Sequence, residues 1–249
     1  MSETRLIRVQ GLTLTYGERT VLDDLGFSLA PGQRLGIIGP NGSGKTTLLH
    51  CLMGLVPPDK GDIRLFGSDM RTEKDFAAAR RRIGFLFQNP DDQLFCPTVI
   101  DDVAFGPLNL GKDPQSALEV ATTTLQRLGL EGYGNRVTYR LSGGEKKLVA
   151  LATILAMEPE VLLLDEPTND LDEATRHRLV HILQDLSPPS VLVSHDYDFL
   201  RETADSLAAM QDGALLPSPM SALHEHVHAH PLGTVPHSHG ADRAPLKNP

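Results

Sequence analysis

The chain has 249 residues, of which 40% are hydrophobic and 22% charged, as is usual for a soluble globular protein of one large or two small domains. Its formal net charge of −9 argues against broad electrostatic binding to nucleic acid or anionic lipid. No apolar run approaches the roughly 20 residues of a membrane-spanning helix, and the N-terminus lacks a signal-peptide core, so we expect a cytoplasmic protein. Cys51 and Cys96 lack disulfide or metal-site spacing and are expected to be reduced packing residues.

The first third of the chain is predicted to contain short strands separated by turn residues. Alternating and continuous apolar stretches predict strands at 6–9, 12–16, 27–29, 34–38, 62–66 and 83–87. The pair Pro31-Gly32 marks a turn between the third and the fourth of these. A helix is predicted from Lys45 to Met53, because Gly54 can end it and Pro57-Pro58 cannot continue it.

A glycine-rich loop joins the strand at 34–38 to this helix. Its residues fit the phosphate-binding pattern G-x-x-x-x-G-K-[ST] and read Gly39, Pro40, Asn41, Gly42, Ser43, Gly44, Lys45 and Thr46. The glycines let backbone N–H groups converge on phosphate oxygens, Lys45 can reach the terminal phosphates, and the Thr46 hydroxyl can ligate Mg²⁺. Thr47 continues into the first helical turn, whose N-terminus also faces the anion. The strand–loop–helix context favours a phosphate site over a chance glycine-rich turn.

Residues 91–150 are predicted to be mainly helical. Asp113-Pro114 caps one helix, whose apolar residues recur at helical spacing: Ala117, Leu118, Ala121, Leu125 and Leu128. Two small basic clusters, Arg80–Arg82 and Lys146-Lys147, are interpreted as solvated helix faces.

Two continuous apolar runs, Val161–Leu164 and Val191–Val193, are typical of strands buried on both faces, and an amphipathic helix is predicted between them at Glu173–Leu186. Strands that alternate with helices imply an α/β protein with a mostly parallel sheet. The first run ends in two carboxylates. Asp165 can hold Mg²⁺ through its water shell, and Glu166 can orient or deprotonate an attacking water. A solvated strand end is the alternative, and the phosphate loop upstream weighs against it.

A second candidate anion site precedes a helix predicted at Lys146–Met157. It reads Leu141, Ser142, Gly143, Gly144 and Glu145. A Ser-Gly-Gly turn at a helix N-terminus can bind phosphate, although a simple capped helix is the alternative. Two phosphate-binding helix ends in one chain suggest that a second copy of the protein completes one of the sites.

Over about residues 5–215 these motifs, in this order, resemble those of ATP-binding-cassette ATPases. The resemblance implies that Tyr16 stacks on adenine, that Gln88 contacts Mg²⁺ and the nucleophilic water, and that His195 is the switch histidine near the γ-phosphate. It also implies a head-to-tail ATPase dimer, in which Ser142, Gly143 and Gly144 face the ATP and Mg²⁺ of the partner copy. The loop at 169–172 resembles the one that crosses the dimer interface.

The same resemblance implies a P-loop NTPase fold: a RecA-like core of mostly parallel sheet with helices on both faces, an N-terminal antiparallel β subdomain and an inserted helical subdomain. The core is expected at 1–90 and 151–215, the helical subdomain at 91–150 and a tail at 216–249. Two residues depart from the family pattern. In this resemblance Leu141–Glu145 is the signature sequence, where Glu145 stands in place of a common glutamine. Leu148 replaces an arginine, which removes a positive charge from the helix after that sequence.

The segments 87–95 and 99–107 are similar to those of ATPases from energy-coupling-factor importers, and most like the cobalt and nickel importer subunits. Their position directly after Gln88 suits the transfer of the nucleotide state to a docked membrane protein. A variable linker into the helices is the alternative.

Residues 216–249 contain six prolines, no aromatic residue and six histidines, which predicts a disordered tail. Neutral imidazole suits Ni²⁺ and Co²⁺, and the candidate ligands are His224, His226, His228, His230, His237 and His239. A low-complexity tail without metal is the alternative.

The sequence therefore predicts an ATP-hydrolysing subunit of a Ni²⁺ or Co²⁺ importer, peripheral on the cytoplasmic face of the cell membrane. Its expected partners are a second ATPase, identical or paralogous, and integral membrane subunits. Two other functions stay open. One is a non-transport ATPase of the same family, serving cofactor assembly or DNA maintenance. The other is an importer ATPase for another small nutrient, with a metal-buffering tail.

Overall fold

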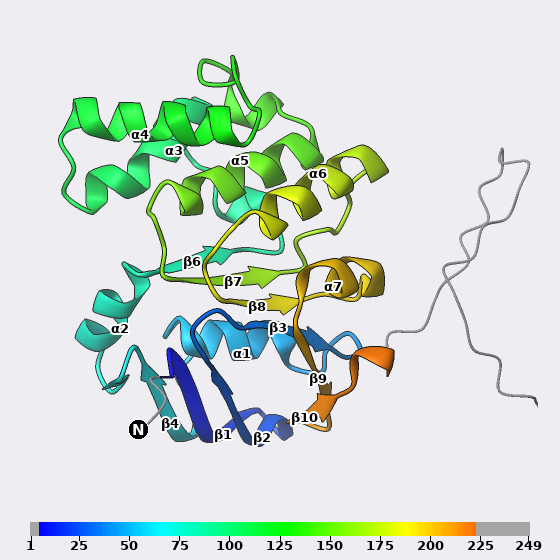
Figure 1. The fold of residues 1–249 in the computed structure, drawn as a ribbon. Helices are drawn as coiled ribbons and strands as arrows, with labels where there is room; N and C mark the ends of the chain where they lie inside the picture. Colours follow the sequence, from blue (N-terminus) through cyan, green and yellow to red (C-terminus); the bar gives the residue numbers. More distant parts are fainter. Residues whose placement is uncertain (1–4, 223–249) are drawn as a thin grey trace, which may run out of the picture.

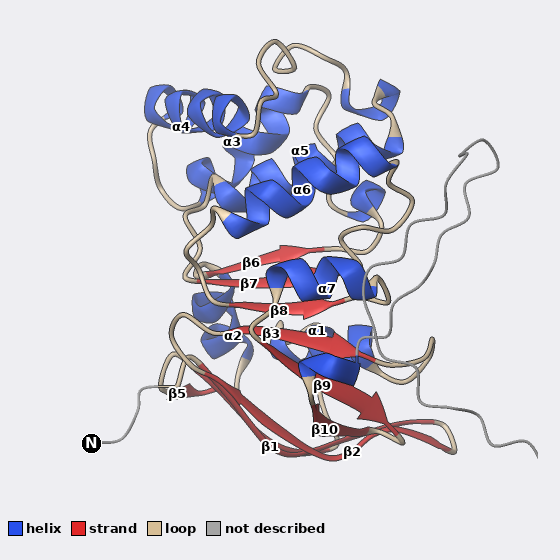
Figure 2. Cartoon of the chain, turned by 45° about the vertical axis from the view of Figure 1, so that its right-hand side comes forward, coloured by secondary structure: helices blue, strands red, loops and turns tan. Residues whose placement is uncertain are grey.

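The computed structural model describes residues 5–222, in which two β-sheets and their helices form successive layers (Figures 1 and 2). The larger sheet has six strands in the order β10-β9-β3-β8-β7-β6. These are β3 (Arg34–Ile38), β6 (Ile83–Leu86), β7 (Val161–Asp165), β8 (Ser190–Val193), β9 (Ser206–Gln211) and β10 (Ala214–Ser218). All neighbours in it are parallel except β10, which pairs antiparallel with β9. The predicted mostly parallel α/β core is confirmed.

The smaller sheet is antiparallel, with the order β2-β1-β4-β5. Its strands are β1 (Ile7–Tyr16), β2 (Arg19–Leu29), β4 (Lys60–Leu65) and β5 (Ser68–Asp69). The prediction of separate strands at 6–9 and 12–16 was wrong, because β1 is continuous. The register of β1 shifts between Val9 and Leu12, where Gly11 takes a positive φ of 63°. The glycine therefore forms a bulge within one strand and not a turn between two strands.

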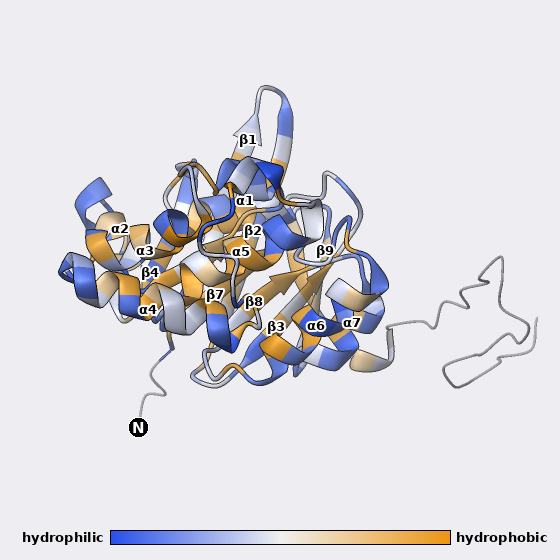
Figure 3. Cartoon of the chain, turned by 90° about the horizontal axis from the view of Figure 1, so that it is seen from above, coloured by the Kyte–Doolittle hydropathy of each residue, from blue (hydrophilic) through white to orange (hydrophobic). Residues whose placement is uncertain are grey.

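The larger sheet is buried on both faces, because successive side chains of a strand point to opposite sides. In β7, Val161 and Leu163 join the core that contains α1 (Lys45–Leu52), whereas Leu162 and Leu164 belong to the second hydrophobic core, on the opposite face of the sheet. Seen from above, the strands are largely hydrophobic, and the outer helices α6 (Glu173–Gln184) and α7 (Tyr197–Thr203) also show hydrophilic residues (Figure 3).

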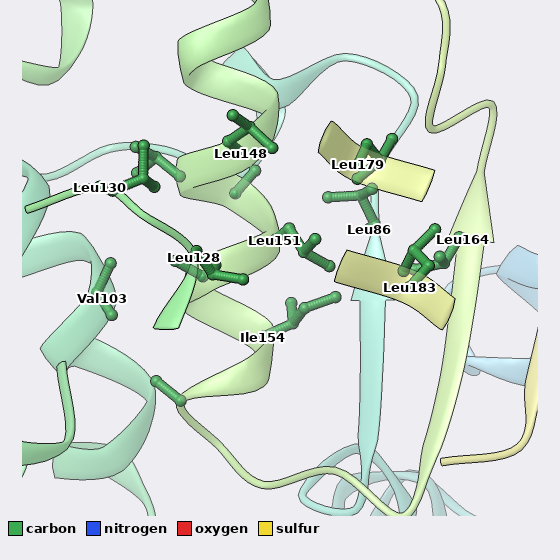
Figure 4. Close-up of a cluster of buried hydrophobic side chains, with 14 of the residues drawn as sticks. Leu86, Val103, Leu128, Leu130, Leu148, Leu151, Ile154, Leu164, Leu179 and Leu183 are labelled. Atoms are coloured by element: carbon green, nitrogen blue, oxygen red, sulfur yellow. The ribbon is translucent and has the colours of Figure 1, made fainter. Parts of the chain in front are cut away.

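The helical subdomain packs on the face of the sheet opposite α1. It comprises α3 (Val99–Asn109), α4 (Pro114–Arg127) and α5 (Gly143–Leu155), with short 3₁₀ turns at η1 (Pro90–Asp92) and η2 (Thr138–Arg140). The central helix is α5, whose Leu151 and Ile154 lie between Leu128 on one side and Leu86 on the other (Figure 4). Leu118, one of the apolar residues at helical spacing in α4, is 50% exposed.

Some predicted boundaries fall inside elements of the structure. The boundary at 150 lies within α5, and the tail start at 216 lies within β10, where Leu216 pairs with Ala209. Pro217 fits there because β10 is an edge strand. The sequence analysis did not predict α2 (Glu73–Arg80), α7, β9 or β10. Within residues 5–222 no helix is long and apolar enough to cross a membrane.

Candidate nucleotide-hydrolysis site

The phosphate loop lies between β3 and α1, as predicted. Gly44 caps α1 with φ 106°, and a Cβ atom there would lie 2.8 Å from the Val21 carbonyl oxygen, so the position requires glycine. Lys45 is buried, and its Nζ donates to the carbonyl oxygens of Gly39 at 2.7 Å and Pro40 at 3.1 Å. The loop thus holds its lysine among backbone groups at the N-terminus of a helix, which is an arrangement that binds phosphate.

The carboxylate of Asp165, at the end of β7, lies beside this loop. It accepts a hydrogen bond from the Thr46 hydroxyl. Burial raises the pKa of Asp165, and the Thr46 hydrogen bond opposes that rise. Asp165 Oδ1 and Ser43 Oγ are buried without a hydrogen-bond partner in the described part of the chain. Unpaired buried oxygens next to a phosphate loop fit Mg²⁺, which takes carboxylate and hydroxyl ligands together with substrate phosphates.

Glu166 and His195 are in direct contact, although 29 residues separate them. His195 follows β8, the neighbour of β7, and its Nδ1 lies 2.9 Å from Glu166 Oε2. The His195 backbone N–H donates to the same oxygen at 3.2 Å. Glu166 is 5% exposed and takes a positive φ of 46°, which is a strained conformation for a non-glycine residue. Such strain persists where neighbours fix the backbone, and it is common at catalytic sites.

An ion pair that the sequence analysis missed holds the turn around His195. Arg176 of α6 donates to both carboxylate oxygens of Asp196, at 2.6 and 3.1 Å. Burial raises the pKa of Asp196, but hydrogen bonds from Arg176 and the Phe199 N–H outweigh it, so the pKa lies below its ordinary value. Nothing in the sequence pairs Arg176 with Asp196, because the contact depends on how α6 packs against α7.

Gln88 lies in the loop that follows β6, and Tyr16 is the last residue of β1. Gln88 is exposed two residues beyond β6, which pairs in parallel with β7, so it follows the same strand ends as Asp165. Tyr16 is 53% exposed at the end of β1. The adjoining hairpin is tied to the phosphate loop, because Arg19 donates to the Gly42 carbonyl oxygen at 2.8 Å.

The start of α5 forms a capping box, in which Ser142 Oγ accepts from the Glu145 N–H and Glu145 Oε2 accepts from the Ser142 N–H at 2.8 Å. Glu145 Oε1 also accepts from the Tyr133 hydroxyl and Arg136, both at 2.9 Å. Glu145 is therefore fixed within its own chain. The hydrogen bond from the Ser142 N–H is the largest cause that lowers the pKa of Glu145, and the bond from the Tyr133 hydroxyl lowers it further.

The two glycines of this turn differ in their surroundings. Among the described residues, a Cβ atom on Gly143 would meet nothing within 4 Å, whereas one on Gly144 would lie 3.1 Å from Thr175 of α6. Since α5 and α1 lie on opposite faces of the sheet, this turn and the phosphate loop of the same chain form separate surfaces (Figure 1).

Leu148, the departure from the family pattern, is 3% exposed in the helical core. The interpretation of Lys146-Lys147 as a solvated face was wrong for Lys147, which is 2% exposed. Helix α5 is almost entirely buried from Lys147 onward. The sequence feature that could have indicated this burial is the position of the lysine directly before the apolar run 148–152. In the other basic cluster, Arg82 forms an ion pair with Glu160, and its guanidinium group stacks on the Phe66 ring.

The six tail histidines proposed as metal ligands lie outside the described residues. Between residues 5 and 222, no three or more histidine, cysteine, aspartate or glutamate side chains are grouped to hold a metal ion.

Comparisons with known proteins agree with this geometry. The sequence matches the ABC transporter family over residues 22–169. It is 41% identical over 216 residues to the energy-coupling factor transporter ATP-binding protein EcfA of Methanothermobacter thermautotrophicus, covering 85% of this chain and 70% of that protein.

Two solved structures superpose with a TM-score of 0.77. One is cbiO1 of Clostridium perfringens, part of the ABC transporter complex cbiONQ, with 31% identity over 86% of this chain and 88% of that one. The other is the dimeric cassette MJ0796 in a post-hydrolysis state bound to ADP and Pi, with 26% identity over 84% of this chain and 96% of that one. The chain therefore belongs to the ABC transporter family and is one of its ATPases.

Proposed function

We propose that Glu166 is the general base that activates water for attack on the terminal phosphate of ATP, and that His195 holds its carboxylate in place. The contact between these two residues is the observation that carries the proposal. Both of its hydrogen bonds fall on Oε2 of Glu166, so the carboxylate is oriented by one of its two oxygens. ATP would lie along Gly39–Thr47, with Tyr16 against the adenine.

Asp165 and Thr46 would hold Mg²⁺, with Gln88 as a further ligand on the side of the attacking water. The ion would neutralise charge that develops on the phosphate oxygens. Asp165 is suited to this role because its buried Oδ1 is without a protein partner in the described residues. Lys45 would move from its own loop carbonyls to the terminal phosphates.

The active form in this proposal is a head-to-tail dimer, of two identical chains or of this chain and a paralogue. Ser142, Gly143 and Gly144 of one copy would contact the nucleotide on the phosphate loop of the other. The separation of these surfaces by the central sheet supports this, as does the open space at Gly143. The dimeric state of the related cassette adds further support.

This ATPase is proposed to energise an importer of the energy-coupling-factor type, with Ni²⁺ or Co²⁺ as cargo. The similarity to EcfA and cbiO1 supports the transporter type. An exposed aromatic pair supports a docking surface for a membrane subunit. Phe95 is 66% and Phe105 45% exposed, and their ring centroids lie 4.7 Å apart in an edge-to-face arrangement. The chain would then lie peripherally on the cytoplasmic face of the cell membrane.

The test is co-expression with the membrane proteins encoded beside this chain, followed by purification and transport assays. We expect membrane proteins to co-purify and cells to accumulate radiolabelled Ni²⁺ or Co²⁺ only with an intact Glu166. Uptake of a different nutrient would be consistent with the proposed ATPase role but would reject Ni²⁺ and Co²⁺ as the cargo. A chain that hydrolyses ATP and captures no membrane protein would indicate a non-transport ATPase.

The histidine tail gives a separate prediction. A peptide spanning 216–249 should bind Ni²⁺ or Co²⁺ at pH 7.5 and release it at pH 5.5, because protonated imidazole cannot ligate a metal. Calorimetry at both pH values checks this. An absence of binding heat at pH 7.5 would remove the tail as support for a metal importer, and deletion of 223–249 would separate metal storage from transport.

A further inference from the structure

Lys147 is a buried cation that the proposed hydrolysis mechanism does not use. It lies one turn into α5, directly behind the turn 142–144, and is 2% exposed. Its Nζ donates to the carbonyl oxygen of Gln88 at 2.5 Å and lies 3.4 Å from that of Phe87. Burial lowers its pKa to about 8, and the carboxylates of Asp165 and Asp170 limit the fall. A buried ammonium is costly unless it is hydrogen-bonded, and at Lys147 the acceptors are backbone carbonyl oxygens of one segment.

The carbonyl groups that Lys147 contacts belong to the segment that leaves β6 toward the helical subdomain. This segment, residues 87–93, is attached to α5 at two further places. Lys146 Nζ pairs with Asp91 Oδ1 at 2.6 Å. Gln93 Nε2 donates to the Ala150 carbonyl oxygen at 2.7 Å and to Thr153 Oγ1 at 2.8 Å.

Gln93 also closes the segment on itself, because its Oε1 accepts from the Phe87 N–H at 3.3 Å. Both ends of the 87–93 segment and its middle are therefore bound to one helix. Of these contacts, only the one from Lys147 reaches the backbone of Gln88 itself. Because Lys147 is packed within α5 and its Nζ donates to the Gln88 carbonyl oxygen, a displacement of α5 along its axis would draw on that carbonyl group.

We propose that Lys147 is a positioning residue for ATP hydrolysis, because it fixes the backbone of Gln88 to α5. The Gln88 side chain would then meet the nucleotide only when the α5 turn 142–144 is in contact with the nucleotide of the partner copy. This inference rests on the proposed function, because it takes Gln88 as the residue beside the attacking water. In each chain, α5 would connect two parts of the dimer. One is the turn 142–144, which contacts the partner's nucleotide, and the other is Gln88, which contacts the nucleotide bound to the same chain. The two sites of the dimer would then be coupled through α5.

Lys147→Met tests this, since methionine fills a similar volume and cannot donate a hydrogen bond. We expect kcat for ATP hydrolysis to fall about tenfold or more while KM for ATP stays within about twofold, because the phosphate loop and Tyr16 are untouched. Lys147→Arg, which keeps charge and donors, should recover part of the loss. Lys74→Met, on the exposed face of α2, is the matched control and should hydrolyse ATP like the wild type.

A double-mutant cycle with Gln88→Ala separates positioning from a general structural effect. If Lys147 acts through Gln88, Lys147→Met should lower kcat little further in the Gln88→Ala background. An equal fold-loss in both backgrounds, or an unchanged kcat in Lys147→Met, would overturn the proposal. Thermal melts identify a variant that fails to fold, and Lys147→Gln then replaces the methionine variant. A wild-type chain without ATPase activity would instead reject the proposed function.

Discussion

Two of the residues proposed for chemistry are held in unfavourable local environments. Glu166 combines a positive φ with a nearly buried carboxylate, and Asp165 has a buried oxygen without a partner among the described residues. An unliganded fold gains nothing from either feature, so both are better explained by the reaction than by stability. The surrounding structure offsets this cost, since His195 and the Arg176–Asp196 pair fix the local backbone.

Replacement of Glu166 by Gln should lower kcat for ATP hydrolysis by about 10²- to 10⁴-fold, because the attacking water loses its base. Binding of ATP should persist, since the phosphate loop is unchanged. Steady-state hydrolysis and fluorescence titration with a labelled ATP analogue measure the two effects. Glu131→Gln, at an exposed position, is the matched control. Normal turnover by Glu166→Gln would refute the assignment.

Replacement of Glu145 by Gln should lower the free energy of unfolding by no more than about 1 kcal/mol at pH 7.5, because the ion pair with Arg136 is half exposed. The pKa of Glu145 is lowered in the folded chain, so its stabilisation is present above about pH 4.3 and is lost as the pH falls below that. Urea unfolding of both proteins at pH 7.5 and pH 4 should show the difference shrinking on acidification. A difference that grows would contradict the capping role.

At the scale of elements, the segment between β6 and α3 is built to present an exposed surface from a rigid base. The Asp102 carboxylate, 3% exposed, accepts from the N–H groups of Phe95 and Cys96 at 3.0 and 2.9 Å and from the Thr138 hydroxyl at 3.0 Å. The loop that carries Phe95 is therefore held by hydrogen bonds in the helical core, while its ring faces solvent. An ordered, exposed aromatic side chain is typical of a docking site.

Phe95→Ala should weaken co-purification with membrane subunits and reduce transport, and it should leave ATP affinity of the isolated subunit unchanged, because Phe95 lies outside the proposed nucleotide contacts. Changes at Asp91 and Asp92 should act in the same direction. Leu55→Ala removes another half-exposed apolar side chain, beyond α1, and serves as control. Equal losses of uptake and ATP affinity would assign Phe95 to the fold.

At the scale of the whole molecule, the proposed dimer depends on two surfaces that one chain cannot bring together. Gly143 offers a direct test, because a Cβ atom there would lie more than 4 Å from the other described residues apart from its chain neighbours and its own helix backbone. In a Glu166→Gln background, ATP should produce a dimer detectable by light scattering. Adding Gly143→Asp should abolish that dimer through repulsion of the partner's phosphates, with an unchanged melting temperature. Persistence of the dimer would argue against the head-to-tail arrangement.

Much of the fold could be predicted from the sequence, since its signals are local. Glycine positions alone define a loop that can wrap phosphate, and continuous apolar runs identified β7 and β8. Asp113 and Ser142 cap helices near the predicted positions. These features depend on backbone geometry and on neighbours a few residues apart, which the sequence states directly.

Only the tertiary structure decided which side chains meet and which are buried. Lys146 and Lys147 are adjacent, but about 100° of rotation on a helix separates them, and packing against the 87–93 segment buries only the second fully. Leu118 has the helical spacing of the buried residues of α4, but half of its side chain is exposed in the described part of the chain. Glu166 meets His195 because β7 and β8 are neighbours in a parallel sheet. Such contacts depend on how segments that are distant in the sequence pack against one another, so local sequence patterns cannot predict them.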